Sequence, residues 1–475
     1  MQNHVFQTLL EEALNALGQL SFAQCQRIAN KMEDSSFRKI LNQLVSAEMV
    51  YEGLGFVRQR FFRKENLGLA LKTLQGDVKD WRGRVDLAED GPMAGVRSVL
   101  EALEVYCLVR ERLVHVHTTL ASAERHVEST YVALFEEMGN IEGMYIAADG
   151  DAGLNLLLPL KNLGYLVECE VSCLRSLFQA EVACEEYKFK DAAFQLFLAN
   201  DQIMKLQSLV INNSHTLAAG AATGGVASCS ELHQFYAKLI ASLTDKTGLF
   251  FYRVLSSKQI DLTCDNSASA PLRLLWQYQS QTKARSVSLI YLIRPEQPFC
   301  VDGYACSHGG LTDQLTGLQS FPSVCNVPAD PPIEHWPNIV SILQRELLPH
   351  LDSHKTSSPW SQLPSSTPPT STPSTSTSAT TSSYSSLLSY LRPHASPSPT
   401  TPSTPKAPRP KSYIHFYDPK VNATYLLAHV VPRLVLSIVH QGRYEDRKQA
   451  GMAFGARIGK CLEHEDALTF LRVKS

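Results

Sequence analysis

The sequence has few charged residues, no excess of basic ones and no long apolar run. Of its 475 residues 19% are charged, and 44 Lys+Arg against 46 Asp+Glu give a formal net charge of −2. Because sequence-independent nucleic-acid binding relies on a basic excess that neutralises phosphates, this balance disfavours that class of protein. The apolar stretch 425–439 is interrupted by His429, Pro432 and Arg433. It falls short of the run of about 20 apolar residues that a spanning helix needs, so we expect a soluble protein.

Motifs that carry chemistry are missing as well. The Gly-rich stretch 220–225 is not followed by Lys-Ser or Lys-Thr and comes after a helical pattern, so it does not match a phosphate-binding loop. No Gly-x-Ser-x-Gly, His-Glu-x-x-His or Cys-x-x-Cys pattern occurs. The adjacent acidic pairs at 136–137 and 185–186 cannot face each other on a helix, and we interpret them as solvated surface charges. The sequence therefore indicates no catalytic residue and no cofactor.

Cysteine usage favours a reducing compartment. The chain has 11 cysteines, an odd number, and several, such as those at 107, 169, 173 and 184, lie inside apolar stripes. The first 20 residues contain Glu11 and Glu12 and lack a basic segment, which argues against a secretory signal and makes the cytosol the expected location. Cys300, Cys306 and His308 are soft ligands, but their spacing does not match a structural zinc site. A metal-binding enzyme that uses these three residues stays as a minor alternative.

One segment has the composition of a disordered insert. Residues 353–411 comprise 59 positions, of which 29 are Ser or Thr, 12 are Pro and none is acidic. Such a segment buries too little apolar area to offset its ordering entropy, so we predict that it is disordered. It also contains possible proline-directed phosphorylation sites, although composition alone generates Ser-Pro and Thr-Pro pairs.

Residues 1–260 have the periodicity of a multihelical domain. Apolar side chains recur at spacings of three and four, which places them on one face of a helix. The clearest stripe runs from Val99 to Met138 and predicts a long helix or a kinked pair that ends at Gly139. Further stripes cover residues 6–17, 163–178, 191–210 and 230–255, and the Gly- and Ala-rich stretch 217–228 between the last two predicts a flexible loop.

After a connector at 261–284, the pattern becomes that of a small α/β domain. Alternating apolar residues predict a strand over 287–293, in a first part at 285–352, and three more strands over 413–417, 423–430 and 434–440, in a second part at 412–475. The last two strands are close enough for a hairpin, and a terminal helix follows from 445 to about 462. Gly451, Gly455 and Gly459 fall on one face of that helix, which indicates close approach to a sheet or another helix. The predicted fold class is α+β, interrupted by the insert.

Two segments of the α/β part resemble the KICSTOR subunit 2 family. They are Pro328 to Ile339, with the sequence PADPPIEHWPNI, and Ile414 to Tyr425, with the sequence IHFYDPKVNATY. The stretch Ala47 to Tyr51, the residues Phe61 to Lys64 and the stretch Leu163 to Lys190 are similar to the family too. The resemblance spans nearly the whole chain outside the insert and the Gly- and Ala-rich loop, which depart from the family pattern.

The resemblance implies a role without enzymatic activity. Family membership would make the chain an adaptor or scaffold that recruits the GATOR Rag-GTPase-activating complex to lysosomes and restrains mTOR complex 1 when amino acids are scarce. The implied partners are the large scaffold subunit, kaptin and the FG-GAP repeat subunit. The implied location is the cytoplasm and the lysosomal surface, reached through these partners only.

Within the two family-like segments, His335, Trp336, Phe416, Tyr417 and Asp418 are candidate interaction or anchor residues. Buried aromatic side chains are usually core, so an internal anchor is favoured over a subunit contact. The strands, hairpin and terminal helix also resemble longin and roadblock domains, which bind small GTPases. A GTPase-regulating trafficking adaptor is therefore the alternative function, on fold analogy alone.

Overall fold

The fold is described from a computed structural model of the full chain. Contacts divide it into two compact units: Met1–Val340 with Tyr413–Ser475, and Ser341–Ser412. The structure describes residues 2–58, 66–86, 94–122, 128–147, 154–217, 230–256, 270–293, 321–328, 332–349, 413–444 and 448–473. The predicted disordered insert, the predicted loop at 217–228 except Leu217, and the possible ligands Cys300, Cys306 and His308 lie outside the described residues.

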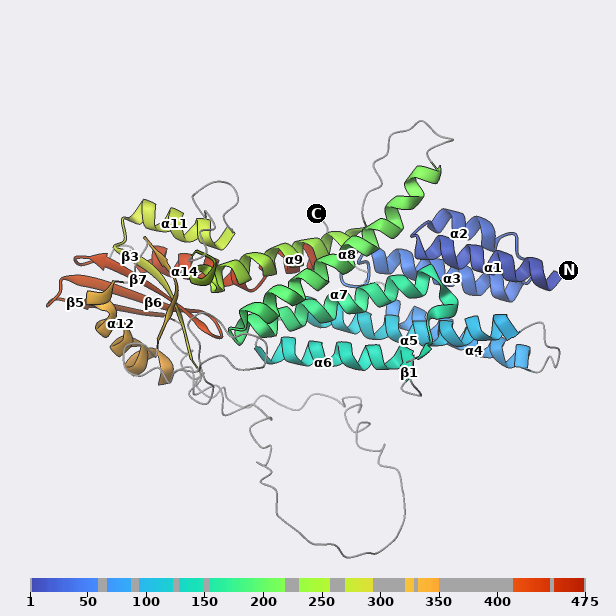
Figure 1. The fold of residues 1–475 in the computed structure, drawn as a ribbon, viewed down its shortest axis with the longest axis horizontal. Helices are drawn as coiled ribbons and strands as arrows, with labels where there is room; N and C mark the ends of the chain where they lie inside the picture. The colour runs from blue at the N-terminus through green and yellow to red at the C-terminus, as the bar shows by residue number, and fades with distance from the viewer. Residues whose placement is uncertain are drawn as a thin grey trace, which may run out of the picture. The chain divides into compact units, whose positions relative to one another are not determined.

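The N-terminal half of the larger unit is a bundle of long helices (Figure 1). They are α1 (Gln2–Gly18), α2 (Phe22–Ala29), α3 (Ser35–Glu52), α4 (Leu67–Asp86), α5 (Ala94–Ser122), α6 (Glu128–Tyr145), α7 (Asn162–Glu185), α8 (Phe189–Leu217) and α9 (Glu231–Phe250). Asp34 caps α3 by accepting hydrogen bonds from the backbone of Ser36 and Phe37, both at 2.8 Å. Apolar side chains from all of these helices form one continuous core. The predicted multihelical part is confirmed.

The stripe from Val99 to Met138 belongs to two helices, α5 and α6, as one of the two alternatives had it. The expected end at Gly139 is wrong, because α6 continues to Tyr145. A Cβ atom at Gly139 or Gly143 would meet nothing within 4 Å, so these glycines lie on an open helix face and do not end the helix. Between α6 and α7 the chain forms the short antiparallel pair β1 (Ile146–Ala147) and β2 (Leu154–Asn155), then the 3-10 turn η2 (Leu158–Leu160).

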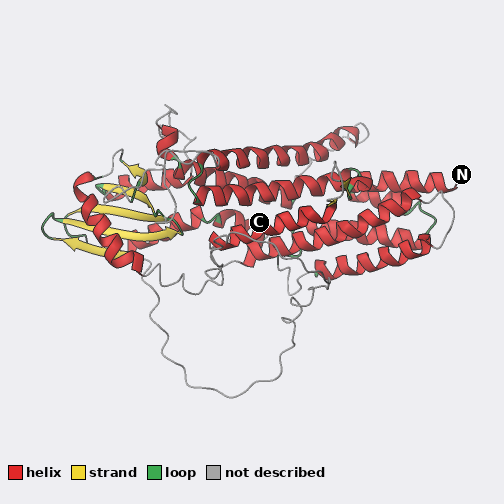
Figure 2. Cartoon of the chain, turned by 60° about the horizontal axis from the view of Figure 1, so that its bottom comes forward, coloured by secondary structure: helices red, strands yellow, loops and turns green. Residues whose placement is uncertain are grey.

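The C-terminal part of the larger unit contains an antiparallel five-stranded sheet of order β4-β3-β7-β6-β5 (Figure 2). Its strands are β3 (Ser286–Tyr291), β4 (Ser323–Val327), β5 (Tyr413–Asp418), β6 (Ala423–Val431) and β7 (Leu434–Gln441). The predicted strands and the β6–β7 hairpin are confirmed, whereas β4 was not predicted. The predicted α+β fold class is also confirmed.

Further helices and turns belong to the C-terminal half of the chain. They are α10 (Tyr252–Ser256), α11 (Ala270–Thr282), the turn η4 (Ile333–His335), α12 (Trp336–Ile342), α14 (Lys448–Leu462) and α15 (Glu465–Arg472). The π-helical turn η5 (Leu343–Leu347) belongs to the smaller unit. Helix α11 lies in what was expected to be a connector, and α15 follows the predicted terminal helix. The domain boundaries themselves stay a proposal.

Helix α14 lies against β6 through its three glycines. Cβ atoms built at Gly451, Gly455 and Gly459 would come within 2.6 Å of a Leu426 methyl, 3.1 Å of the Ala428 Cβ and 3.0 Å of the Val430 carbonyl oxygen. A helix advances about 6 Å over four residues and a strand about 6.7 Å over two. Successive glycines of α14 therefore meet alternate residues of β6. The close approach predicted from glycine spacing is confirmed, and the partner is the sheet.

The last helix joins the sheet region to the bundle. Ala467, Leu468 and Leu471 of α15 are buried in the core that the bundle helices form. Tyr291, at the end of β3, donates a hydrogen bond of 2.8 Å to the carbonyl oxygen of Glu185, at the end of α7. The bundle and the sheet are therefore packed together inside the larger unit.

Candidate functional site

Three of the five predicted residues lie around Tyr425 of β6: His335 and Phe416 contact it, and Asp418 is linked to it through Asn338. His335 Nδ1 lies 2.8 Å from the Tyr425 oxygen. Asn338, in the first turn of α12, donates to the same oxygen at 3.0 Å and to Asp418 Oδ2 at 3.1 Å. Phe416 pairs with Tyr425 across the two strands, and the ring centroids are 6.4 Å apart. We call this group the Tyr425 cluster.

The Tyr425 cluster holds its histidine in the neutral form. His335 is buried, and burial together with the positive charge of Arg285 lowers its pKa. The Tyr425 hydroxyl shares one hydrogen bond with His335 Nδ1 and accepts another from Asn338. This arrangement fastens the start of α12 to the outer strands of the sheet.

The remaining two predicted residues lie beside the cluster. Trp336 is nearly buried and begins α12. The Tyr417 hydroxyl donates to Asn422 Oδ1 at 3.0 Å, and the guanidinium of Arg443 lies 5.8 Å from the Tyr417 ring centroid. Because side chains alternate along a strand, Tyr417 faces the α14 side of the sheet and Phe416 faces the opposite side. The functional role of all five residues stays a prediction.

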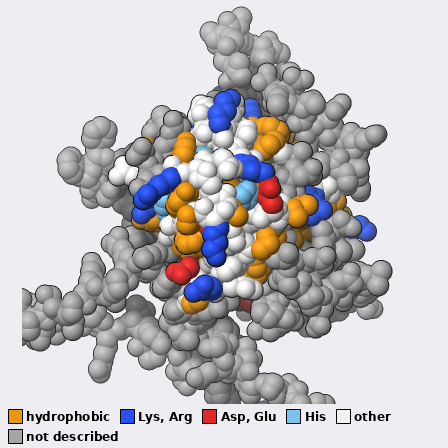
Figure 3. All heavy atoms as spheres, turned by 90° about the vertical axis from the view of Figure 1, so that its left-hand side faces the viewer, with side chains coloured by type: hydrophobic (Ala, Val, Ile, Leu, Met, Phe, Trp, Pro, Cys, Tyr) orange, Lys and Arg blue, Asp and Glu red, His pale blue; other side chains and the backbone are white. Residues whose placement is uncertain are grey.

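The end of the sheet exposes apolar and basic side chains together. Phe416 is 44% exposed and Val421, in the β5–β6 turn, is 41% exposed. Lys420, in the same turn as Val421, and Arg443, which follows β7, are exposed as well. Figure 3 looks onto this end, where basic side chains in blue lie among apolar ones in orange. We call Phe416, Val421, Lys420 and Arg443 the sheet-end surface.

A buried ionic network in the bundle was not predicted. Arg110 of α5 donates to both oxygens of Glu48 on α3, at 3.2 and 2.9 Å, and also pairs with Glu170 of α7. Tyr106 and Tyr51 contact its guanidinium, through a hydrogen bond of 3.0 Å and a cation–π contact of 4.2 Å. Arg110, Glu48 and Glu170 are at most 1% exposed. We call this the Arg110 network.

Hydroxyl groups complete the Arg110 network. Tyr236 of α9 donates to Glu170 Oε1 at 2.6 Å, and Tyr51 donates to the same oxygen. The ring of His117 bridges the Tyr236 hydroxyl, at 2.9 Å, and the Leu113 carbonyl, at 2.7 Å. Burial alone would raise the pKa of Glu170, but Arg110, His117 and the hydroxyl donors outweigh it and lower the pKa. Arg110 and Glu170 therefore form a charged pair inside the bundle.

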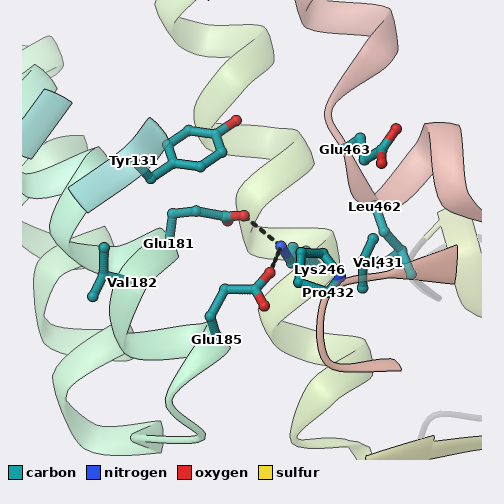
Figure 4. A pocket seen from close by; sticks show the side chains of 9 residues that line it. All are labelled: Tyr131, Glu181, Val182, Glu185, Lys246, Val431, Pro432, Leu462 and Glu463. Carbon is teal, nitrogen blue, oxygen red and sulfur yellow. Dashed lines mark hydrogen bonds and ion pairs between the residues drawn. The ribbon is translucent and has the colours of Figure 1, made fainter. Parts of the chain in front are cut away.

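A second ionic network lies where the bundle meets the sheet region (Figure 4). Lys246 of α9 donates to Glu181 and, at 2.6 Å, to Glu185, both on α7. His464, between α14 and α15, contacts Glu181 Oε2 at 3.1 Å and Ser242 Oγ at 2.9 Å. We call this the Lys246 network. The expectation that Glu185 is a solvated surface charge is wrong, since its side chain is 5% exposed.

The Lys246 network borders a small cavity. Glu181, Glu185 and Lys246 line it together with Val431 and Pro432 of the β6–β7 turn. The cavity has room for about one water molecule, so it does not accommodate a metabolite. Lys246 and His464 outweigh the effect of burial and lower the pKa of Glu181 to about 2. The Lys246 network is therefore charged, and it links α7, α9 and the segment between α14 and α15.

Within the described part of the chain, no three His, Cys, Asp or Glu side chains lie close enough to share a metal ion. No helix there is both long and apolar enough to cross a membrane. The cysteines at 25, 107, 169, 173, 184 and 325 are buried thiols, as the sequence predicted for those in its apolar stripes.

Comparison with known proteins gives one consistent result. The family model described as "KICSTOR complex C12orf66 like" matches residues 4–353. The protein named KICSTOR subunit 2 of Xenopus laevis is 20% identical over 492 aligned positions, which cover 98% of this chain and 96% of that protein. KICSTOR subunit 2 of Danio rerio is also 20% identical, over 98% of this chain and 95% of its own length. The similarity therefore extends over both the helical and the sheet regions.

Proposed function

The chain belongs to the KICSTOR complex C12orf66-like family, and from this premise we propose that it acts as a non-catalytic adaptor or scaffold subunit of a KICSTOR-type complex. The observation that carries the proposal is the similarity to KICSTOR subunit 2 over 98% of the chain. The family name describes a component of a multi-subunit complex. A subunit of this kind acts through its surfaces, so its functional residues are contacts.

The chemistry of the described residues supports an adaptor. Within each of the two buried ionic networks, the charged groups pair with one another. The cavity beside Lys246 has room for about one water molecule. In the Tyr425 cluster, His335 Nδ1, the Tyr425 hydroxyl, Asn338 and Asp418 likewise bond to one another. An enzyme needs reactive groups that face a pocket of substrate size. These groups instead fix how the helices and the sheet pack.

The proposed partners are the large scaffold subunit, kaptin and the FG-GAP repeat subunit. Through them the chain would recruit the GATOR Rag-GTPase-activating complex to lysosomes and restrain mTOR complex 1 when amino acids are scarce. We assign the sheet-end surface to one of these partners, because exposed Phe416 and Val421 provide apolar area and Lys420 and Arg443 favour an acidic rim. The location would be the cytoplasm and the lysosomal surface, reached through the partners.

A second candidate function follows from the sheet. Five antiparallel strands followed by α14 support the resemblance to longin and roadblock domains, so a GTPase-regulating trafficking adaptor is the alternative. The two candidates differ in the partners that co-purify: KICSTOR-type subunits in the first, a small GTPase without them in the second.

Removal of the chain from its own cells tests the adaptor role. On amino-acid withdrawal, cells without it should keep mTOR complex 1 active and should lose GATOR from lysosomes, and the intact chain should restore both. The Phe416→Glu variant should fail to restore them, whereas Leu69→Glu, at an exposed position on α4 of the bundle, should succeed. Normal shut-off of mTOR complex 1 in cells without the chain would reject the proposal.

A further inference from the structure

Helix α8 exposes a row of large apolar side chains. Phe194, Phe197 and Met204 are 55%, 67% and 57% exposed. Helical periodicity places the three on one face, opposite the buried Ala199 and Ile203 that pack into the core beside α7 and α9 (Figure 1). A single exposed apolar residue is ordinary, but three in helical register form a docking face.

The face has the spacing of a coiled-coil seam. Positions 190, 194, 197, 201, 204 and 208 follow one another at alternating intervals of four and three. Exposed Lys190 precedes the two phenylalanines, and Asp201 follows them. Asp201 pairs with Lys205 of its own helix at 2.7 Å on the open surface, a type of interaction that contributes little stability. A positive charge and a negative charge thus bracket an apolar centre.

We propose that this face binds a second copy of the chain, with α8 against α8 in antiparallel orientation. The two-fold axis passes between positions 195 and 196. Phe194 of each copy then lies opposite Phe197 of the other, and Lys190 lies opposite Asp201. The interface is self-complementary, as a two-fold contact between identical chains requires.

The proposed register differs from its neighbours because it places apolar side chains opposite apolar ones and Lys190 opposite Asp201. A shift of the axis by one seam position places Asp201 opposite Phe197, and a further shift places it opposite Met204. Both buried arrangements leave a carboxylate against an apolar side chain, which is costly. In the proposed register Ala193 also lies opposite Leu198, so a small side chain makes room for a large one beside the phenylalanines.

The size of the face predicts a weak dimer. With about 200 Å² per phenylalanine side chain, the four exposed rings bury roughly 500 Å² in all. Stable interfaces bury about 1,200–2,000 Å². We therefore expect a weak, concentration-dependent dimer of the isolated chain. The proposal does not rest on the adaptor function.

Analytical ultracentrifugation of the full chain from about 1 to 300 µM tests the dimer. The wild type should shift from monomer to dimer, and Phe197→Glu should weaken association at least ~10-fold because it buries a charge in the apolar centre. Leu69→Glu is the matched control, at an exposed position of α4, and should associate like the wild type. A wild type that stays monomeric at the highest concentration overturns the proposal.

Charge reversal tests the register. Lys190→Asp and Asp201→Lys should each weaken self-association, because each variant sets like charges opposite one another. An equimolar mixture of the two variants should associate as tightly as the wild type, since every pair in the mixed dimer is again attractive. A mixture no tighter than either variant alone overturns the proposed register. If Phe197→Glu instead releases a different protein subunit from a chain that stays monomeric, the face belongs to that subunit and the proposal is wrong.

Discussion

The helical bundle and the sheet are held together by different kinds of buried side chain. The bundle encloses Arg110 and Glu170 as a charged pair with hydroxyl donors around it. The sheet buries mainly apolar strands, and α14 reaches β6 through glycines at van der Waals distance. The apolar core of the bundle thus contains paired charges, whereas the contact between α14 and β6 depends on close-fitting shape.

This difference distinguishes buried groups that hold the fold together from exposed groups that we propose as contacts to partners. Buried charges in the bundle satisfy one another, so they determine which helix faces meet and offer nothing to a partner. The surfaces proposed to contact other proteins are exposed instead: the sheet-end surface with apolar and basic side chains, and the face of α8 with apolar side chains between Lys190 and Asp201. The Lys246 network lies where the two regions join. Four predictions follow from this contrast, from the largest expected effect to the smallest.

Removal of the central cation should damage the bundle most. Arg110→Met leaves Glu48 and Glu170 buried without their counter-charge, and breaking such a buried pair costs about 3–5 kcal/mol. Urea denaturation measures the free energy of unfolding. Arg112→Met is the control on the same helix, because Arg112 is 54% exposed and its pair with Glu137 contributes under about 1 kcal/mol. Equal losses in the two variants would contradict the assigned role of the Arg110 network.

Low pH should weaken the packing of the bundle against the sheet region. The pKa of Glu181 is lowered from 4.5 to about 2, so its charge stabilises the fold above about pH 4.5 and that contribution is lost as pH falls toward 2. At ~1.4 kcal/mol per pH unit the contribution is roughly 3 kcal/mol. Glu181→Gln should therefore be much less stable than the wild type at pH 6, with a gap that narrows on acidification. A gap that stays constant down to pH 3 would refute the charged state of Glu181.

The carboxyl group of Glu52 in the bundle should give the opposite pH dependence of stability. Burial raises the pKa of Glu52 from 4.5 to about 8. The folded chain holds a proton that the unfolded chain releases, so stability falls as pH rises from about 4.5 to 8. Glu52→Gln should remove this fall, so the variant should have the higher free energy of unfolding at pH 8. Parallel pH profiles of unfolding free energy for the two proteins would show that Glu52 is not the group responsible.

The addition of one methyl group should destabilise the chain in the sheet region and stabilise it in the bundle. Gly459→Ala brings a methyl group to 3.0 Å from the Val430 carbonyl oxygen and should destabilise the chain by about 1–2 kcal/mol. Gly143→Ala lies in α6 with nothing within 4 Å and should stabilise by about 0.5–1 kcal/mol through helix propensity. Thermal melts of both variants give the comparison. A stabilising Gly459→Ala would mean that α14 is not held against β6 at this distance.

Periodic features of the fold were predictable because the sequence carries them locally. The α7 stripe, the strands β5 to β7 and the glycine face of α14 follow from spacing alone. Strand β4 was missed because Ser323–Val327 has only five residues and includes a buried serine and a buried asparagine, so it lacks the longer apolar run that marked the other strands.

The ionic networks were missed although a signal was present. Arg110 lies four residues after Tyr106 and three before Leu113, on the apolar stripe of α5, and Glu170 lies on the stripe of α7 in the same way. A charged residue on such a stripe indicates a buried partner, but the stripe does not say which helix supplies it. Among the candidate site residues, those around Tyr425 come from segments about 90 residues apart, so their meeting depends on the tertiary fold.

Quantitative affinity purification of the full chain from its own cells tests the central claim most directly. The account predicts that the large scaffold subunit, kaptin and the FG-GAP repeat subunit co-purify with it in stoichiometric amounts. Recovery of the chain without these subunits, under conditions that preserve the complex for its other members, would contradict the assignment to a KICSTOR-type complex.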